Sequence, residues 1–229
     1  MKYFTKNWEN ITDKKAAKER ANYVLKPIKK YKGVKKILEL GVGVGSVIQY
    51  FPKKYEISGL DIKKDYISIC KKKFPKYKFY VASIHNFKIK EKFDVIFSVY
   101  DSINFLKNIG QWEKTFELVK NHLNDGGLFI FDMYTEKALK EFKGKSEYTK
   151  KFKFGYVNSK GIVKGNRLVW DFKIFEKKTK NKYKIHRNKF VEYIQPTKKV
   201  KIELLKYFKI LKEERMEDGR RLLFVCRKI

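Results

Sequence analysis

Residues 37–45, with the sequence I-L-E-L-G-V-G-V-G, constrain the fold of this chain more than any other stretch. An apolar run that carries an acid, Glu39, leads into a loop with alternating glycines at Gly41, Gly43 and Gly45. Glycines let the backbone turn tightly and let a ligand approach the main chain. About twenty residues later a second apolar run ends in Asp61, the position from which an acid can accept hydrogen bonds from ribose hydroxyls. The two stretches predict an adenosine-containing ligand across the carboxyl ends of a parallel sheet.

The spacing of the glycines separates two classes of cofactor. The nicotinamide dinucleotide fingerprint is G-x-G-x-x-G, whose third glycine allows close packing of helix on strand. Here the run is G-x-G-x-G, and Ser46 occupies the sixth position. The acid at Glu39 suits a cationic ligand, such as a sulfonium with its amino group, better than an anionic pyrophosphate. A nucleotide-dependent oxidoreductase is therefore the least favoured interpretation.

Apolar runs alternate with helical patterns through the first two thirds of the chain, which predicts a doubly wound α/β sheet of Rossmann-like type. The run at residues 93–100 is almost unbroken, as expected for a parallel strand buried on both faces. We predict strands at residues 34–40, 55–60, 77–82, 93–100 and 128–133, and helices at residues 9–31, 46–51, 65–74 and 111–123.

The pattern changes after about residue 145, where it favours antiparallel strands. We expect three of them, at residues 151–158, 161–176 and 182–194, with turns at residues 158–161 and 178–181. A helix from Pro196 and strands at residues 208–215 and 221–227 complete a seven-stranded sheet. The predicted organisation is a core at residues 1–145, an inserted antiparallel β-sheet lid at residues 146–195, and a C-terminal segment at residues 196–229 that completes the core sheet.

The charge of the chain leaves a question about its partners. It has 56 basic and 25 acidic residues, a net charge of +31, and residues 141–200 alone carry about +13. Such a surplus can bind the phosphates of a nucleic acid. Most of it is lysine, however, whereas specific phosphate contacts favour arginine. Two explanations of the charge therefore stay open: a phosphate-binding surface, or a bias in the composition of the chain.

Targeting and redox signals point to the cytoplasm. The first ten residues show no apolar stretch of a signal peptide, and no uncharged run approaches the length of a membrane span. Cys70 and Cys226 are too few and too far apart for a metal site or a disulfide framework. We expect a cytoplasmic protein without a membrane partner or a bound metal.

The glycine loop resembles motif I of the class I S-adenosylmethionine-dependent methyltransferases, and Asp61 matches the ribose-binding acid of motif II. Residues 93–106 resemble motif IV and its following loop, and their Y-D-S-I-N-F-L ending is similar to a subgroup that methylates small molecules, including amines and amino sugars. That subgroup also inserts antiparallel strands after the fifth sheet strand. Asn/Asp-Pro-Pro-Tyr/Phe, the loop of enzymes that methylate exocyclic base amines, is missing.

The resemblance implies S-adenosylmethionine as the cofactor and a set of residues that hold it. Ser83 stands where the family often has an acid that contacts adenine, so this contact is weaker than usual. The expected cofactor-binding residues are Glu39, Gly41, Gly43, Gly45, Asp61, Ile62, Ser83, Ile84 and Tyr100.

Catalysis then needs alignment of a nucleophile with the methyl group and, for some acceptors, a base. Polar side chains at the strand ends and under the lid are the candidates, and we predict Tyr100, Tyr134 and His186 as catalytic residues. The predicted function is methyl transfer to a small molecule, most simply at nitrogen. The alternatives are a methyltransferase of RNA or another polyanion that uses the lysine-rich insertion, and a methyltransferase-like partner protein without activity.

Overall fold

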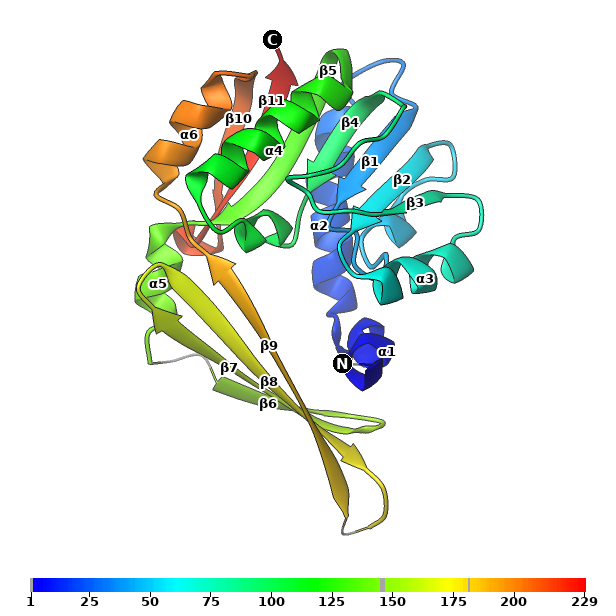
Figure 1. Cartoon of the computed structure of the whole chain (residues 1–229), viewed down its shortest axis with the longest axis vertical. Coiled ribbons are helices and arrows are strands. Elements are labelled where there is room, and N and C mark those ends of the chain that lie inside the picture. The colour runs from blue at the N-terminus through cyan, green and yellow to red at the C-terminus, as the bar shows by residue number, and fades with distance from the viewer. Residues whose placement is uncertain (1, 145–146, 181) are drawn as a thin grey trace.

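A computed structural model describes residues 2–144, 147–180 and 182–229, which form two separate sheets (Figure 1). The larger sheet has seven strands in the order β10-β11-β5-β4-β1-β2-β3, and the smaller has four in the order β6-β7-β8-β9. In the large sheet β1, β2, β3, β4 and β5 run parallel, whereas β11 runs antiparallel to β5 and β10 antiparallel to β11. The predicted doubly wound sheet with a separate antiparallel sheet is confirmed.

The elements of the core follow the predicted alternation. Its helices are α1 (Lys2–Ile11), α2 (Lys14–Ile28), η1 (Ile48–Tyr50), α3 (Lys64–Lys73), η2 (Ser102–Phe105), α4 (Ile109–His122), α5 (Glu136–Phe142), α6 (Thr197–Leu205) and η3 (Glu217–Gly219). Its strands are β1 (Lys36–Leu40), β2 (Glu56–Asp61), β3 (Lys78–Val81), β4 (Phe93–Ser98), β5 (Leu123–Tyr134), β10 (Phe208–Met216) and β11 (Arg221–Lys228).

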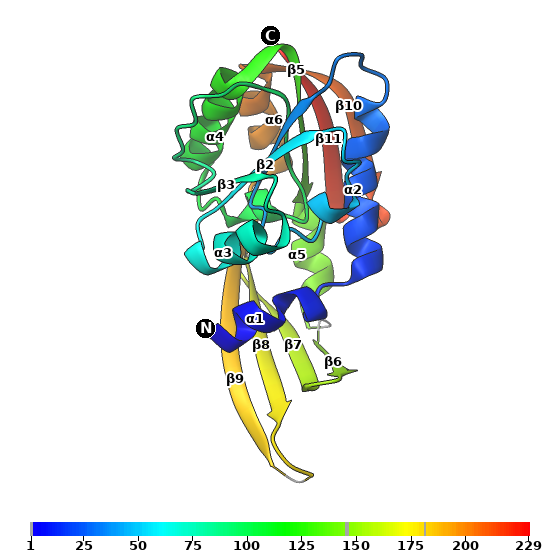
Figure 2. The same ribbon diagram turned by 90° about the vertical axis from the view of Figure 1, so that its right-hand side faces the viewer.

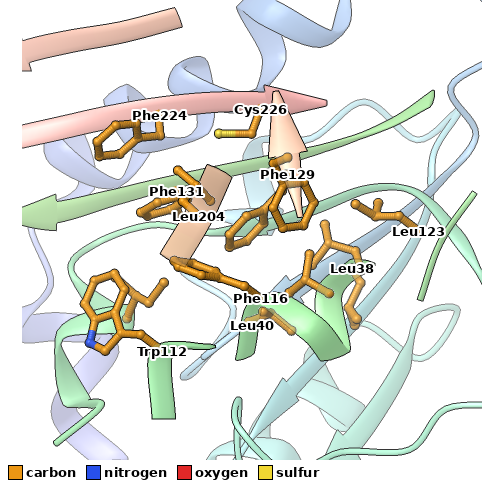
Figure 3. Packing of buried hydrophobic residues seen from close by; sticks show 14 of the residues in the cluster. Leu38, Leu40, Trp112, Phe116, Leu123, Phe129, Phe131, Leu204, Phe224 and Cys226 are labelled. Carbon is orange, nitrogen blue, oxygen red and sulfur yellow. The ribbon is translucent and has the colours of Figure 1, made fainter. Parts of the chain in front are cut away.

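Helices cover both faces of the large sheet. Residues of α2 and α3 pack on one face, and residues of α4 and α6 pack on the other. Figure 3 shows the face covered by α4 and α6, where Trp112 and Phe116 of α4 and Leu204 of α6 pack with Phe129 and Phe131 of β5. These side chains are fully buried, and each large apolar side chain removed from water contributes about 1.5–3 kcal/mol. The sheet is therefore a rigid base for whatever lies at its strand ends.

The predicted helix at residues 9–31 is wrong, because the chain forms two helices there. The Asp13 carboxylate accepts hydrogen bonds from the backbone amides of Lys15 (2.8 Å) and Ala16 (3.2 Å), so Asp13 caps a new helix. The separate α1 packs Phe4 and Trp8 against the small sheet instead of continuing along the core. Figures 1 and 2 show α1 lying between the core and the small sheet.

The small sheet has four strands rather than the predicted three: β6 (Glu147–Phe152), β7 (Gly155–Lys164), β8 (Arg167–Lys177) and β9 (Tyr183–Tyr193). We call this sheet the lid. The turn predicted at residues 158–161 lies inside β7, where Ser159 and Gly161 are buried opposite the large rings of Phe172 and Trp170. Small residues beside large ones pack well, which outweighs their turn preference.

Two further sequence predictions fall at the edge of what is described. The predicted turn at residues 178–181 includes Asn181, which lies outside the described residues; beside it, the Lys178 amide donates to the Lys182 carbonyl at 2.9 Å. The predicted boundary between residues 145 and 146 lies outside them too. In the described ranges, no helix combines the length and the apolar character needed to cross a membrane.

Candidate active site

The glycine loop leaves β1 at the carboxyl edge of the large sheet and is tied to the neighbouring strand. The backbone amides of Gly41 and Val42 both donate to the Leu60 carbonyl of β2, at 2.9 Å. Gly41, Gly43 and Gly45 have φ angles of +77°, +54° and +77°, in the left-handed region that favours glycine. The sequence therefore fixes a curved loop whose main chain faces the end of β2.

Asp61 closes this loop from the tip of β2. One oxygen of its carboxylate accepts from the Gly43 amide and the other from the Lys63 amide, both at 2.9 Å. Burial raises the pKa of Asp61, and these two hydrogen bonds oppose the rise. Beside it, the Ile62 side chain is 68% exposed, an apolar surface next to the carboxylate. An acid with an apolar neighbour is a suitable contact for a ribose and an adenine ring.

Glu39 is the strongest sign that the loop receives a cation. Its side chain is only 2% exposed, and its Oε2 atom has no hydrogen-bond partner among the residues that the structure describes. Burial, assisted by the negative charge of Asp61, raises the pKa of Glu39 well above its ordinary value. At Gly43, a Cβ atom would meet no atom of the described ranges within 4 Å, so the loop is open there. A buried acid without a partner beside an open glycine loop fits the charged methionine half of S-adenosylmethionine.

The loop after β3 carries the residues expected near adenine. The Ser83 hydroxyl lies 2.8 Å from Nδ1 of His85, so its hydrogen-bonding capacity is already shared within the loop. Ile84 is half-buried against the core. The contact of Ser83 with adenine stays a prediction.

A strained turn follows β4 and abuts the glycine loop. Tyr100 and Asp101 have φ angles of +64° and +53°, a conformation that costs non-glycine residues free energy. The Asp132 carboxylate of β5 holds both residues, accepting from their amides at 3.2 and 2.8 Å. Next in the chain, the Ser102 hydroxyl lies 3.4 Å from the Gly41 carbonyl. The turn therefore places polar groups directly beside the glycine loop.

Tyr100 and Tyr134, two of the predicted catalytic residues, lie at the ends of adjacent strands. Tyr100 is half-buried beneath the Arg20 guanidinium, and burial raises the pKa of its phenol to about 12. Tyr134 lies under the Arg221 guanidinium at 4.3 Å, and burial raises its pKa well above the ordinary value. Both phenols are therefore neutral near pH 7 and suited to donating hydrogen bonds rather than accepting a proton.

His186, the third predicted catalytic residue, lies elsewhere. It is on β9, seven residues before the end of the strand, which is about 23 Å along the chain at 3.3 Å per residue. Its Nε2 atom is 2.9 Å from Glu176 of β8, and its ring stacks on Tyr3 of α1 at 4.0 Å. The structure brings His186 to the contact between lid and α1, not to the strand ends.

Sequence reasoning missed the arginines beneath the strained turn. Nη2 of Arg221 lies 2.9 Å from the Asp101 carboxylate, and Nη1 lies 3.3 Å from Asp132. Arg20 approaches Asp132 from the other side at 3.4 Å. The only sequence signal is that arginine is rare among the 56 basic residues of the chain.

The comparisons with known proteins agree with this geometry. Residues 37–127 match the family model described as a methyltransferase domain. A dTDP-3-amino-3,4,6-trideoxy-alpha-D-glucopyranose N,N-dimethyltransferase from Streptomyces venezuelae is 22% identical over 97 residues, 42% of this chain. The aligned part spans 41% of that relative, less than half its length.

Two solved structures cover nearly the whole chain. An S-adenosylmethionine-dependent methyltransferase from Clostridium acetobutylicum has a TM-score of 0.82 at 18% identity, covering 99% of this chain and 96% of its own. An amino pentose methyltransferase from Micromonospora echinaspora, solved with S-adenosylmethionine bound, has a TM-score of 0.78 at 13% identity, covering 100% and 97%. The chain matches a methyltransferase domain over residues 37–127, and its fold is that of S-adenosylmethionine-dependent methyltransferases. The cofactor of this class is S-adenosylmethionine.

Proposed function

We propose that the protein methylates a nitrogen atom of a small-molecule acceptor. The observation that supports this most is the contact between Ser102 and Gly41, because it brings the turn with Tyr100 and Asp101 against the glycine loop. When bound there, S-adenosylmethionine supplies an electrophilic methyl group on its sulfonium. An acceptor held at Tyr100 and Asp101 would face that group, and alignment of this kind is the main source of acceleration in such transfers.

In this proposal Glu39 and Asp61 hold the charged and ribose parts of the cofactor, the three glycines let it approach the main chain, and Ile62 and Ile84 border the adenine. Tyr100 and Tyr134 donate hydrogen bonds at the strand ends. The lid covers the acceptor and excludes water, which strengthens these polar contacts. We leave His186 out of the proposed site because Glu176 and Tyr3 occupy its ring.

The preference for nitrogen has two supports. The Streptomyces relative is an N,N-dimethyltransferase of an amino sugar, and the Micromonospora neighbour is an amino pentose methyltransferase. The Asp101 carboxylate also lies at the turn where the acceptor is proposed to bind, and a negative charge there favours a basic acceptor.

A panel of paired acceptors tests the proposal. Purified protein is incubated with methyl-labelled S-adenosylmethionine and with amines and alcohols of matched shape, such as amino sugars and the corresponding sugars. We expect label in amines alone. Transfer to the alcohols at equal rates would refute the assignment to nitrogen, and transfer to RNA alone would replace it with the polyanion alternative.

A further inference from the structure

Glu192 of the lid lies beside the acceptor side of the core. It is only 5% exposed, although it belongs to β9 rather than to the large sheet. The next residue, Tyr193, accepts a hydrogen bond through its carbonyl from the Asn104 side-chain amide at 3.4 Å. The Asn104 side-chain oxygen in turn accepts from the Tyr134 amide at 2.9 Å. Asn104 thus fixes the end of β9, with Glu192, to the turn after β4 and to the end of β5.

Glu192 lies near a cluster of acids and arginines that has too little positive charge, since the charges of Asp101, Asp132 and Arg221 all act on its carboxylate. The ion pairs of the cluster have N–O distances of 2.6–3.4 Å and connect Asp101, Asp132 and Glu217 with Arg20 and Arg221. Within the described residues, Glu192 forms no ion pair with either guanidinium. Four carboxylates therefore face two guanidiniums, and the fully ionised cluster is two positive charges short.

The environment of Glu192 itself favours the arrival of a cation. Burial raises its pKa well above the ordinary value, and the negative charges of Asp101 and Asp132 raise it further. The Trp170 indole N–H, which donates to Oε2 at 3.0 Å, and the charge of Arg221 oppose this rise. In turn, the negative charge of Glu192 contributes to the raised pKa of the Tyr134 phenol. A bound cation would offset the repulsion and let the carboxylate ionise.

A metal ion is not the expected source of the missing positive charge. In the part of the chain that the structure describes, no group of three or more His, Cys, Asp or Glu side chains is arranged to hold one. An ammonium group needs less: one carboxylate and a few hydrogen-bond acceptors. An acceptor amine, protonated when it arrives from water near pH 7, supplies such a group.

We propose that Glu192 binds the ammonium group of the acceptor and removes its proton before methyl transfer. This inference rests on the proposed function and names the substrate class as a protonated primary or secondary amine. Asp101 completes the site from the core, with Arg221 keeping its carboxylate in place at 2.9 Å.

The reaction balances in atoms and charge. The ammonium N–H bond breaks and the proton passes to the Glu192 carboxylate, which becomes a neutral acid. The freed lone pair on nitrogen forms the new N–C bond, while the S–C bond breaks and its electron pair stays on sulfur. The sulfonium becomes a thioether, and the product leaves as an N-methylated ammonium ion. Glu192 returns its proton to water when the site opens.

A binding measurement tests the charge recognition without the natural acceptor. The probes are cyclohexylamine and cyclohexanol, which share a shape and differ in charge, titrated with S-adenosylhomocysteine present. The signal is the indole ¹⁵N–¹H resonance of Trp170, assigned by its loss in Trp170→Phe. We expect cyclohexylamine alone to shift it, and Glu192→Gln to abolish the shift while keeping a hydrogen-bond acceptor for the indole. Equal shifts by both probes, no shift by either, or a full shift in Glu192→Gln would overturn the proposal.

Kinetics separate this inference from the proposed function. With an amine acceptor found in the panel above, we expect Glu192→Gln to lower kcat/KM by about 100-fold, as for loss of a general base. The matched control is Glu176→Gln, a lid glutamate at the distal contact with His186, which should keep kcat/KM within about twofold. Amine methylation that persists in Glu192→Gln would overturn the role of Glu192 and leave the proposed function standing. Methylation confined to alcohols or RNA would overturn the proposed function.

Discussion

The Asp132 carboxylate of β5 accepts a hydrogen bond at 2.8 Å from the backbone amide of Asp101, in the turn that follows the adjacent strand β4. The same carboxylate accepts from the Tyr100 amide at 3.2 Å. Tyr100 and Asp101 both have left-handed backbone conformations, which an isolated turn of these residues would rarely adopt. A buried anion thus stabilises a strained turn at the point where the acceptor is proposed to bind.

Replacing Asp132 by Asn tests this support. The Asn side chain has only one oxygen and no charge, so it cannot accept from both backbone amides as the carboxylate does. The substitution also leaves Arg20 and Arg221 without the anion that they share. Removing one partner of a buried ion pair typically costs about 3–5 kcal/mol, so we expect the free energy of unfolding to fall by about 3 kcal/mol. Urea denaturation measures the change.

Asp94→Asn is the matched control for Asp132→Asn. The half-buried Asp94 also accepts from two successive amides, those of Lys35 and Lys36, at 2.9 and 2.8 Å. Because no arginine pairs with Asp94 among the described residues, the expected loss is about 1 kcal/mol. Equal losses in the two variants would contradict the role of the buried anion.

The Glu39 carboxyl makes stability and cofactor binding depend on pH. Its pKa in the folded protein is raised above the ordinary value of 4.5, so the folded state binds more protons than the unfolded chain above that pH. Stability is therefore lost as pH rises through the folded pKa. We expect Glu39→Gln to unfold at a higher temperature than the parent protein at pH 8, with the difference disappearing as pH falls towards 4.5.

Binding of S-adenosylmethionine should then release a proton from Glu39, because the cationic ligand favours the ionised carboxyl. Calorimetry in two buffers of different ionisation enthalpy measures the release, and Glu39→Gln should abolish it. Proton release that is unchanged in Glu39→Gln would show that Glu39 does not meet the cofactor.

Gly45 and Gly43 make a matched pair in the cofactor loop. A Cβ atom at Gly45 would lie 2.5 Å from the ring of Phe74, whereas one at Gly43 meets nothing within 4 Å. Both residues have positive φ, so alanine costs about 1 kcal/mol at either position and about 1–3 kcal/mol more at Gly45. We expect thermal unfolding to show the larger loss for Gly45→Ala. Gly43→Ala should weaken the binding of S-adenosylmethionine at little further cost in stability. A larger loss of stability in Gly43→Ala than in Gly45→Ala, with cofactor binding unchanged, would contradict the proposed path of the cofactor.

Asp61 is the proposed ribose contact. Removing its carboxylate leaves the Gly43 amide without a partner and removes the acceptor for the ribose hydroxyls. We expect Asp61→Ala to raise the dissociation constant of S-adenosylmethionine at least tenfold, which corresponds to about 1.4 kcal/mol. Asp65→Ala, at an exposed acid in the first turn of α3, is the control and should change it by less than about twofold. Similar affinities in the two variants would refute the ribose assignment.

The core could be predicted because its signals are local. Buried strands such as β4 show as apolar runs, and the glycine loop needs φ angles that few other residues adopt. The break between α1 and α2 was missed because the helical periodicity continues across it. Only the short side chain of Asp13, which captures two amides, divides the helices.

The acceptor side could be predicted only in part because its contacts are distant in sequence. Tyr100 stood out as the end of an apolar strand, and Asp101 follows it in the loop that resembles the family motif. Their support did not, since Arg221 lies 120 residues from Asp101 and no local pattern links them. Glu192 was missed because it is one of several acids in a lysine-rich segment, and only the fold shows that it is buried.

Methyl transfer from labelled S-adenosylmethionine into a cell extract, with products separated into small molecules, protein and RNA, tests the central claim most directly. We expect label in the small-molecule fraction, on an amine, and its loss when Asp61→Ala replaces the parent protein. Label in the RNA fraction, or labelling that Asp61→Ala leaves unchanged, would contradict the account.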